Sequence, residues 1–567
     1  MLDYDFGPTH RQWKSCPEGE LIDTSKAFIK PSVRKDCEAL ETLLQSEARG
    51  AQWLILWLDC DREGEAICHE VRARLWRVAS GSVCSCFSLP WRQRQVMDVC
   101  RSTNPRLRIL RARFSALTPQ DVWRAVGPQL GQPDAAAAAA VQLRQEIDLR
   151  LGSAFTRFQT HALQDFFDFG EFSREDGRGP MISYGPCQFP TLGFIVQRHW
   201  EAQAHMPEAM WHVQLSHTAP DGRRADFNWK VLLRARCLLV LLRGADFSLL
   251  HQRGRLFDQR AATVLYEICR AAPLVTVTDV AGSLKKRWAP CPLNTLEMQK
   301  RTCSKLRQSP EQIMKLAEEL YQNGFISYPR TETDSFPPEL DLREIVEEQR
   351  QDNRWGAYAT SLLQNGTMRV PRPGQHNDNA HPPIYPTKWS GGEPSWCAAK
   401  ASLYEFIVRH FLACVSPDAA GDHTLVSATL AGEGFTATGL MIREQGYLSI
   451  YGTGPAIPGG PRFNLAYDQW GGGAGSTLPA YQTGETFMPS SLTLETGHTR
   501  PPELLTETEL LTLMDKHSIG TDATQAAHIS KVCNDRGYAR KLQNGRLEPT
   551  LFGEALVAAY DRVGMVR

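Results

Sequence analysis

The hydrophobic positions near the start of the chain predict a buried strand between two helices. Residues 53–58 read WLILWL, a continuous apolar run typical of a parallel strand that is covered on both faces. Residues 35–49 before this run and residues 66–78 after it have helical spacing, and residues 109–114 resemble a second strand. Residues 1–50 otherwise show little strand pattern. We therefore expect an α/β unit in the first part of the chain.

The rest of the chain alternates between helical and β patterns. Asp134 precedes six alanines, which makes it a good N-cap before strong helix formers, and the helical pattern continues to Gln164. Apolar and polar residues alternate as in half-buried strands at 211–215, 227–229 and 274–280. Later segments predict helices at 293–365 and 398–415, strands at 424–500, and at 503–567 helices with one strand pair near 538–548.

The strand predicted at 53–58 is followed by an acidic cluster, DCDREGE at 59–65. Asp59 and Asp61 stand two apart at the strand's carboxyl end and so point the same way, and Glu63 can join them from the following turn. Carboxylates grouped in this way suit Mg²⁺, which takes a few oxygen ligands and keeps its waters for substrate phosphates. An acidic helix start is the simpler interpretation, and it explains Glu63 but not the pair of aspartates.

A second candidate for chemistry is the tyrosine of GFISYPRTETD at 324–334. A helical segment at 310–321 precedes it and is closed by Asn323-Gly324, so Tyr328 should project from a helix-to-strand turn. Arg330 lies on the same face if the strand continues. A phenol beside a guanidinium suits attack on a phosphodiester, because arginine holds phosphate oxygens and offsets developing charge. An edge-strand tyrosine beside a surface arginine is the simpler alternative.

The composition narrows the classes of function. Lys+Arg and Asp+Glu both number 63 in 567 residues, so the formal charge is zero and nucleic-acid binding would need a local groove. The 15 cysteines include no C-x-x-C pair, which argues against zinc ribbons and against a disulfide framework. No uncharged apolar run reaches the roughly 18 residues of a membrane span, and the N-terminus resembles neither a signal peptide nor an Arg-rich presequence. We expect a soluble intracellular protein with no membrane partner.

Seven motifs resemble those of the type IA DNA topoisomerases and follow the same order along the chain, and the sequences of several are most similar to those of the eukaryotic members. DCDREGE (59–65) is similar to the metal-binding signature of the Toprim domain, and GFISYPRTETD (324–334) is similar to the nucleophile segment. The other matches are ARFSALT (112–118), RQEIDLRLGSAFTRFQT (144–160), SYGPCQFPTLGF (183–194), AHPPIYPTK (380–388) and MDKHSIGTDAT (514–524).

This resemblance implies a multidomain α/β and α+β fold, the type IA toroid, with a truncated Toprim domain, helical groove domains and a discontinuous β gate. The domains expected on this basis are the Toprim domain at 1–130, the DNA-groove domain at 131–203 and 499–567, the β gate at 204–285 and 396–498, and the nucleophile domain at 286–395. The resemblance also implies an activity. One DNA strand is cleaved through a 5′-phosphotyrosine, another strand is passed, and the first is resealed without ATP, consistent with the absence of a G-x-x-x-x-G-K-[ST] loop.

The resemblance also assigns roles to individual residues. Tyr328 becomes the nucleophile, Arg330 and Mg²⁺ on Asp59, Asp61 and Glu63 stabilise charge, and His381 is a proton relay near the scissile phosphate. At the position where relatives commonly carry a further histidine, this chain has Tyr385, to which no role is assigned. The residues expected to line the groove for single-stranded DNA are Arg144, Asp148, Ser183, Tyr184, Gly185, Pro186, Cys187, Gln188, Thr521 and Thr524. From the residues alone, Arg144 and Asp148 are expected to form an ordinary ion pair on one helix face. Residues 183–188 are expected to form a turn whose free N–H groups can hold phosphate. Thr521 or Asp522 is expected to cap a further helix.

The resemblance raises expectations about the ends of the chain and about insertions. The family's Toprim domain opens with a strand ending in a glutamate, usually followed by lysine, whereas residues 1–17 resemble a later part of it. We expect an N-terminally incomplete chain that also stops short of the family's last helical domain and zinc-bearing tail. Residues 231–254 match nothing in the family pattern and are expected to be an insertion or a gene-model artefact. Gly/Pro-rich residues 452–475 should form a disordered loop.

Two alternatives from other classes remain open. One is a catalytically inactive scaffold that binds single-stranded DNA within a helicase complex, which the missing Glu-Lys strand favours. The other is a Toprim nuclease or primase, which would use the carboxylates but not Tyr328. The resemblance also implies a RecQ-family (Bloom-type) helicase and an OB-fold accessory protein as partners, DNA recombination and repair as the setting, and the nucleus as location, with mitochondria as an additional site for a longer form.

Overall fold

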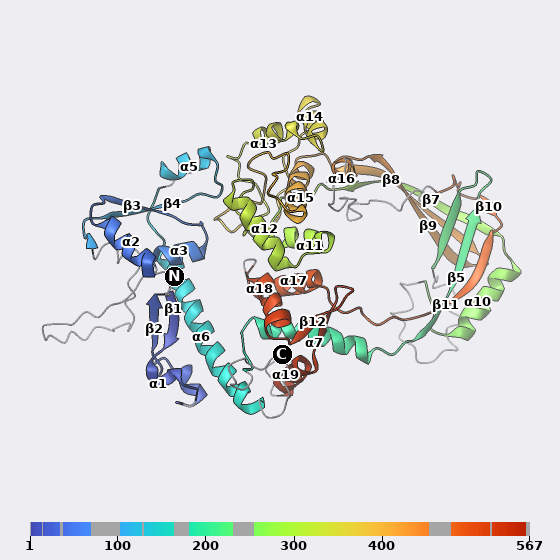
Figure 1. The fold of residues 1–567 in the computed structure, drawn as a ribbon. Helices are drawn as coiled ribbons and strands as arrows, with labels where there is room; N and C mark the ends of the chain where they lie inside the picture. The colour runs from blue at the N-terminus through green and yellow to red at the C-terminus, as the bar shows by residue number, and fades with distance from the viewer. Residues whose placement is uncertain are drawn as a thin grey trace.

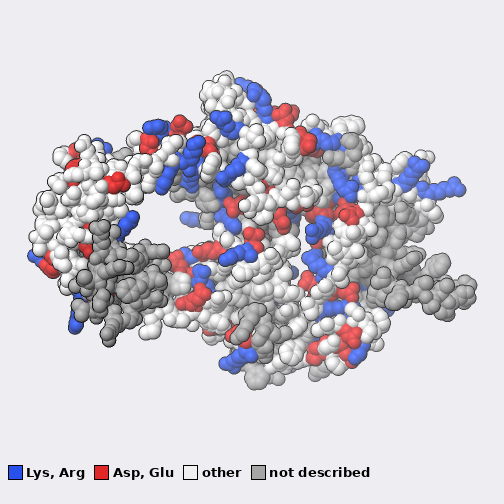
Figure 2. Space-filling view, turned by 180° about the vertical axis from the view of Figure 1, so that it is seen from behind, with Lys and Arg blue, Asp and Glu red and all other residues white. Residues whose placement is uncertain are grey.

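The chain folds into a ring. The computed structural model describes residues 2–13, 15–33, 38–69, 103–127, 130–163, 181–230, 254–452, 478–521 and 524–562. A large curved sheet forms one end of the ring and a small α/β unit the other, with two helical bodies between them (Figure 1). Seen from behind, an opening passes through the molecule, and Lys and Arg side chains line part of its rim (Figure 2). This arrangement is the expected toroid.

The small α/β unit contains the strand that the apolar run predicted. β3 (Trp53–Trp57) pairs in parallel with β4 (Arg108–Ala112), and α2 (Glu38–Ala48) and α3 (Arg62–His69) flank β3 in the chain. Leu56 packs with residues of α2 and α3. Trp53 and Trp57 on the opposite face are 50% and 39% exposed, so the prediction of a strand covered on both faces is wrong. Among the described residues β3 pairs with β4 alone, and the helices cover one side of this pair.

The first fifty residues contain a strand pair that the sequence pattern did not predict. β1 (Leu2–Phe6) and β2 (Ile29–Val33) are antiparallel, with Phe6 opposite Ile29. Two short helices connect them, α1 (Pro8–Arg11) and η1 (Glu18–Leu21). The alternation in β1 covers only five residues and β2 contains a proline, which normally argues against a strand. Tertiary packing stabilises the pair despite this weak local pattern, because Phe6, Leu21 and Ala154 belong to one buried cluster.

Two stretches far apart in the sequence form the lower helical body in Figure 1. The first contains α6 (Ala135–Leu163) and α7 (Gln188–Ala204), whereas α5 (Pro119–Val126), which precedes them, lies beside the α/β unit (Figure 1). The Asp134 cap is confirmed, since its carboxylate accepts the N–H groups of Ala136 and Ala137 at 2.8 and 3.0 Å. The second contains α17 (Glu507–Lys516), α18 (Gln525–Ser530), η6 (Lys531–Asp535), β12 (Ala539–Lys541), β13 (Leu547–Pro549) and α19 (Leu551–Arg562). One core, including Leu192, Leu510 and Leu556, joins the two stretches.

The large sheet confirms the prediction of a discontinuous β gate. Its order is β10-β7-β8-β9-β6-β5-β11, and every neighbouring pair is antiparallel. The strands are β5 (Ala209–Thr218), β6 (Arg224–Lys230), β7 (Val275–Arg287), β8 (Ala419–Leu430), β9 (Glu433–Glu444), β10 (Thr486–Phe487) and β11 (Ser491–His498). Helix α10 (Gln259–Ala271) packs against it through Ala262 and Cys269, which share a core with Phe227 and Phe435.

The upper helical body is inserted between β7 and β8. Its elements are α11 (Thr295–Leu306), α12 (Pro310–Gln322), α13 (Leu342–Glu348), η4 (Gln349–Gln351), α14 (Gly356–Gln364) and α15 (Ala398–Cys414), and α16 (Leu448–Gly452) joins them after β9. Ser309 begins α12 with a capping box to Gln312. α15 lies at the centre of the core, and Tyr404, Phe406 and Phe411 on it are almost fully buried. The helices predicted at 293–365 and 398–415 are confirmed.

The two expected insertions lie largely outside the described residues, at 231–253 and 453–477. Among the helices that the structure describes, none combines the length and the apolar character that crossing a bilayer requires.

Candidate active site

The acidic cluster begins where β3 ends, and its backbone path depends on a glycine. Asp61 accepts the N–H of Gly64 on Oδ1 at 2.6 Å, which fixes the start of α3. A Cβ added to Gly64 would lie 2.0 Å from the carbonyl oxygen of Asp59, so any larger residue would force the two backbone segments apart. Asp59 and Asp61 are therefore held at the carboxyl end of β3, where the sequence predicted them.

A buried arginine that the sequence interpretation missed holds this end of β3. Arg111 of β4 is fully buried and donates to the carbonyl oxygens of Leu58 at 2.8 Å and Asp59 at 2.6 Å. Its charge is matched by Glu65, with 3.1 Å between Nε and Oε1, and Glu65 also accepts the N–H of Asp134 at the start of α6. One ion pair thus links β3, β4, α3 and α6. Apart from Arg108 at its exposed start, β4 is apolar, so the charge at position 111 was the available signal, since buried charges are normally paired.

Tyr328 lies against this acidic cluster. Its hydroxyl donates to Oδ2 of Asp61 at 2.7 Å, its backbone N–H donates to Ser115 at 3.0 Å, and the residue is 4% exposed. The strand predicted around Tyr328 is wrong, because only Ile326 forms a single bridge, to Pro386, and the chain then continues as a loop. Thr295 keeps the loop in place by donating to the carbonyl oxygen of Pro329 at 2.8 Å.

A second tyrosine makes a similar contact. The hydroxyl of Tyr321, at the end of α12, donates to Oδ1 of Asp59 at 3.3 Å. The rings of Tyr321 and Tyr328 meet edge to face, with centroids 5.2 Å apart. Each aspartate of the cluster is thus bonded to its own tyrosine. The sequence interpretation missed Tyr321, although its position in the apolar stripe of α12 beside the candidate nucleophile was visible.

The electrostatics of the cluster favour protonated tyrosines and a cation. Burial, then the charge of Asp61, raises the pKa of Asp59. Burial, followed by the charge of Asp61, also raises the pKa of Tyr328 well above its usual range, whereas Arg330 acts in the opposite direction. The phenol is therefore neutral at physiological pH, and attack by it requires a base that takes its proton. Asp61 is already the hydrogen-bond acceptor of that proton.

His381 packs directly on Tyr328. The two rings lie 4.3 Å apart at an interplanar angle of 36°. Burial lowers the pKa of His381 to about 4, although Asp378 and Asp61 oppose this effect, so the imidazole is neutral near pH 7. Its two ring nitrogens are buried without a hydrogen-bond partner among the described residues. In this arrangement His381 supports the tyrosine ring and has unused hydrogen-bonding capacity beside the hydroxyl.

Three of the predicted site residues form ion pairs away from Asp59 and Asp61. Nε of Arg330 donates to Glu318 of α12 at 2.8 Å, and Arg144 pairs with Glu63 at 2.6 Å. Because Glu63 contacts Arg144, it does not converge with Asp59 and Asp61. Among the described residues, the one triplet of possible metal ligands within 4.8 Å of one another lies elsewhere, at His10, Cys16 and Glu20. The two aspartates still suit Mg²⁺, because a cation between them would offset the burial and the repulsion from Asp61 that together raise the pKa of Asp59.

The expected groove residues gather where α6 meets α7 and α18. Burial raises the pKa of Cys187, the charge of Asp148 raises it further, and the charge of Arg144 opposes, so both α6 side chains lie near the turn before α7. Tyr184 stacks on Phe155 of α6 with centroids 4.7 Å apart, and a Cβ added to Gly185 would lie 2.5 Å from Oε1 of Gln188, so a larger residue there would displace that side chain. The six residues of this turn are Ser183, Tyr184, Gly185, Pro186, Cys187 and Gln188.

Two threonines complete this group from the other stretch. Thr521 donates its N–H to Oγ1 of Thr524 at 3.0 Å, just before α18. The predicted cap is wrong, because Thr524 and not Thr521 is the N-cap of α18, and Asp522 lies outside the described residues. The turn 183–188 and this threonine pair both precede helices that belong to one core.

Comparisons with known proteins agree with this geometry. The family model described as DNA topoisomerase matches residues 132–566. DNA topoisomerase 3-alpha of Arabidopsis thaliana is 44% identical over all of this chain and 54% of its own length, and DNA topoisomerase 3-alpha of Homo sapiens is 40% identical over all of this chain and 48% of its length. The chain thus spans about half the length of these curated relatives. The structure of full-length topoisomerase I from Thermotoga maritima has the same fold, with a TM-score of 0.67, 18% identity, and coverage of 99% of this chain and 79% of that one.

Proposed function

Because the chain belongs to the type IA DNA topoisomerase family, we propose that it cleaves one strand of DNA through Tyr328, passes another strand through the break and reseals it. The proposal rests above all on the 2.7 Å contact between the Tyr328 hydroxyl and Asp61. This contact puts a nucleophile from the upper helical body against a paired carboxylate from the α/β unit. A nuclease or a primase would need the carboxylates alone.

The proposed reaction is a transesterification. The Tyr328 oxygen attacks phosphorus, a new tyrosine–phosphate bond forms, and the bond from phosphorus to the 3′ oxygen breaks. The phenol proton passes to a base, for which Asp61 is best situated, and the departing 3′ oxygen takes up a proton. Resealing is the same exchange in reverse. One ester replaces another at every step, so ATP is not consumed.

We propose that Asp59 and Asp61 hold Mg²⁺ and that Arg330 binds the scissile phosphate. Bound Mg²⁺ would supply positive charge at the phosphate, which the carboxylates would otherwise repel. Glu63 would bind the metal together with Asp59 and Asp61 only after its ion pair with Arg144 breaks. Arg330 would exchange Glu318 for phosphate oxygens, which its planar guanidinium can bind in pairs. His381, neutral beside Tyr328, would relay a proton between these groups.

We further propose that single-stranded DNA follows the turn 183–188 and the pair Thr521 and Thr524. Arg144, which lies near Cys187, adds positive charge that attracts phosphates, whereas the N–H groups of Gln188 and Phe189 at the start of α7 already donate to the carbonyl oxygen of Gly185 at 3.1 Å. Tyr184, part of an aromatic stack with Phe155, offers a surface for a base.

Negatively supercoiled, catenated and recombination-junction DNA are the proposed substrates, and the nucleus is the proposed location. A RecQ-family helicase and an OB-fold accessory protein are the proposed partners. Similarity to DNA topoisomerase 3-alpha of two organisms supports this setting in recombination and repair. Co-purification of the tagged chain with a helicase of that class from nuclear extract tests the partnership, and its absence would remove the helicase from the proposal.

Covalent trapping tests the central proposal. An oligonucleotide labelled at its 3′ end should give a labelled protein adduct in the presence of Mg²⁺, because the 5′ phosphate of the cleaved fragment stays on the protein. Tyr328→Phe should abolish this adduct while binding persists. Tyr321→Phe is the matched control, since it removes a neighbouring hydroxyl that is not the nucleophile. An adduct that survives Tyr328→Phe would exclude Tyr328, and binding by the wild-type protein without any adduct would favour an inactive scaffold.

A further inference from the structure

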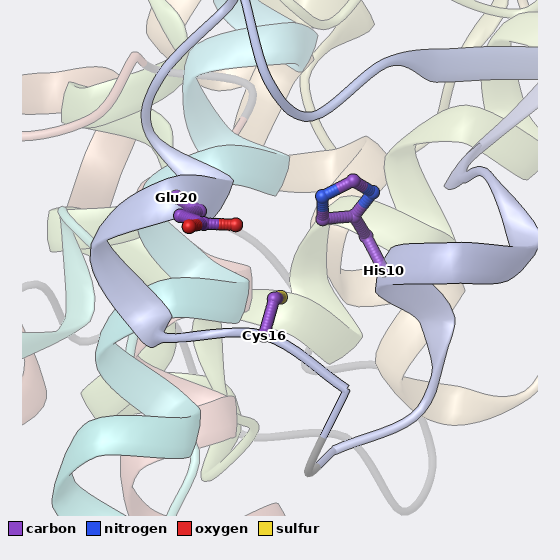
Figure 3. Close-up of side chains that lie close together, drawn as sticks. All are labelled: His10, Cys16 and Glu20. Carbon is purple, nitrogen blue, oxygen red and sulfur yellow. The ribbon is translucent and has the colours of Figure 1, made fainter.

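Three side chains of the first twenty residues converge outside the site described above. His10 extends from α1, Cys16 from the following loop and Glu20 from η1, and one possible ligand atom of each lies within 4.8 Å of the others. Figure 3 shows the imidazole, the thiol and the carboxylate facing a common space. All three are partly buried. We propose that His10, Cys16 and Glu20 bind a zinc ion.

The donor set selects the kind of metal. Nitrogen, sulfur and oxygen ligands suit Zn²⁺, whereas Mg²⁺ and Ca²⁺ prefer oxygen alone. The hydroxyl of Thr9 lies 2.9 Å from Nδ1 of His10, and such a contact fixes the ring and reserves the other nitrogen, Nε2, for a metal. Three protein ligands leave the fourth tetrahedral position to water. The site thus differs in metal and in place from the aspartate pair.

The charges around the triplet are compatible with a divalent cation. A cysteine thiolate and a glutamate together balance the two positive charges of zinc. Two cations of the protein lie close by. Arg157 of α6 donates to Sγ of Cys16 at 3.8 Å, and Lys26 lies 4.0 Å from Glu20. Arg157 also donates to the carbonyl oxygens of His10 at 2.6 Å and Gln12 at 3.2 Å, so its charge is shared among several acceptors.

The ligands come from backbone that is already held in place. Arg157 and Arg150 of α6 bond backbone carbonyls on both sides of the triplet, Arg150 those of Leu21 and Ala27 at 2.9 and 3.0 Å. Leu21, next to the ligand Glu20, is fully buried against Phe6 and Ala154. The metal would therefore bind to a largely preformed loop. It would link α1 to η1, in a segment that Arg150 and Arg157 already bond to α6.

Cobalt titration of the full chain tests the site, because Co²⁺ reports thiolate ligation. In the presence of a phosphine reductant and excess Mg²⁺, which occupies carboxylate sites, one equivalent of Co²⁺ should produce a thiolate-to-cobalt charge-transfer band. Zn²⁺ should displace it. Cys16→Ser should abolish the band and His10→Gln should weaken Co²⁺ binding at least about tenfold, since even the residues behind a ligand change metal affinity 10–100-fold. Cys397→Ser, which changes an exposed thiol elsewhere, should leave the titration unchanged.

The same titration can overturn the proposal. A wild-type chain without the charge-transfer band, or a Cys16→Ser chain that keeps it at full intensity, would exclude the site. Near-ultraviolet circular dichroism establishes whether each variant is folded. If Cys16→Ser is misfolded, the test uses Glu20→Gln and His10→Gln instead. Co²⁺ affinity that is unchanged in both of these folded variants would exclude the site.

Discussion

The hydroxyl of Tyr328 lies 2.7 Å from Oδ2 of Asp61, although 267 positions separate the two residues in the chain. The contact crosses from the upper helical body to the α/β unit. A phosphate between a metal on Asp61 and the attacking oxygen would have to replace this hydrogen bond. The structure therefore shows a closed site, in which the Asp61 carboxylate accepts the hydrogen bond of the Tyr328 hydroxyl.

Neutralising the aspartate pair should separate DNA binding from catalysis. In Asp59→Asn with Asp61→Asn the repulsion between the carboxylates and phosphate disappears, so single-stranded DNA should bind as tightly as in the wild type or tighter. Cleavage and relaxation should fall by about 10²-fold or more, the usual loss when a charge-stabilising group is removed. The measurement is relaxation of negatively supercoiled plasmid across a Mg²⁺ titration, with DNA affinity by fluorescence anisotropy. Normal relaxation at every Mg²⁺ concentration would make the acidic cluster structural.

Releasing Arg330 from Glu318 should strengthen DNA binding. Both side chains are about one-third exposed, so the ion pair itself contributes only about 0.2–1 kcal/mol. Glu318→Gln removes a negative charge beside the proposed phosphate contact and should improve single-strand affinity up to about fivefold at low salt. The gain should shrink as salt is added.

Glu319→Gln is the matched control for this change. Glu319 is adjacent in α12 and also ion-paired, but its partner is Lys400 at 2.9 Å. We expect a much smaller change in DNA affinity. Equal gains in both variants would mean that overall charge, and not Arg330, determines binding.

Local sequence patterns correctly predicted features that depend on neighbouring residues alone, such as helix caps and the alternation of buried and exposed residues along a strand. Asp134 caps α6 with its own side chain, and β6 alternates buried residues such as Phe227 and Trp229 with exposed ones, as its pattern predicted. The family resemblance also implied that the acidic cluster and His381 lie near Tyr328, and Asp61 and His381 do contact it.

Contacts between distant segments explain what the sequence did not predict. The sequence marks the positions of Tyr321 and Arg111 as unusual but does not identify their partners, since each acts through an aspartate or carbonyl group of another element. The β1–β2 pair forms because α6 covers it, not because its short pattern demands a strand. Arg330 and Glu63 belong to the predicted motifs, but their partners Glu318 and Arg144 depend on packing that spacing cannot give.

Stability should fall in acid partly because of His381. Burial lowers its pKa from 6.5 to about 4, so between these values the unfolded chain binds more protons than the folded one. The stabilisation is complete above about pH 6.5 and is lost as the pH falls towards 4, a change on the order of 3 kcal/mol from this pKa difference.

His381→Phe should reduce this acid sensitivity. Phenylalanine preserves a ring against Tyr328 and cannot take up a proton. Thermal midpoints measured from pH 7 to pH 4 should decline less steeply in the variant than in the wild type. His410, whose pKa burial lowers to about 3, titrates in both proteins and provides a common background. Parallel declines would show that protonation of His381 is not linked to unfolding.

Removing the Arg111 guanidinium should disorganise the aspartate cluster more than any other change in the α/β unit. Arg111→Met leaves the buried Glu65 with only the partly exposed Arg113, 3.7 Å away, as an ionic partner, and deprives the carbonyls of Leu58 and Asp59 of their donor. The expected cost is about 3–5 kcal/mol. Hydrogen exchange of peptides covering residues 53–69 should accelerate strongly, and cleavage should be lost because Asp59 is no longer held.

Two further variants distinguish this explanation from a general loss of charge. Arg113 reaches the same glutamate at 3.7 Å, but its side chain is 41% exposed, so Arg113→Met should cost less than about 1 kcal/mol. Adding Glu65→Met to Arg111→Met should restore part of the lost protection, because no uncompensated charge then remains buried. If residues 53–69 exchange their amide hydrogens equally fast in the double variant, the lost protection is due to the missing hydrogen bonds from Arg111 to the carbonyl oxygens of Leu58 and Asp59. Unchanged protection in Arg111→Met would refute its structural role altogether.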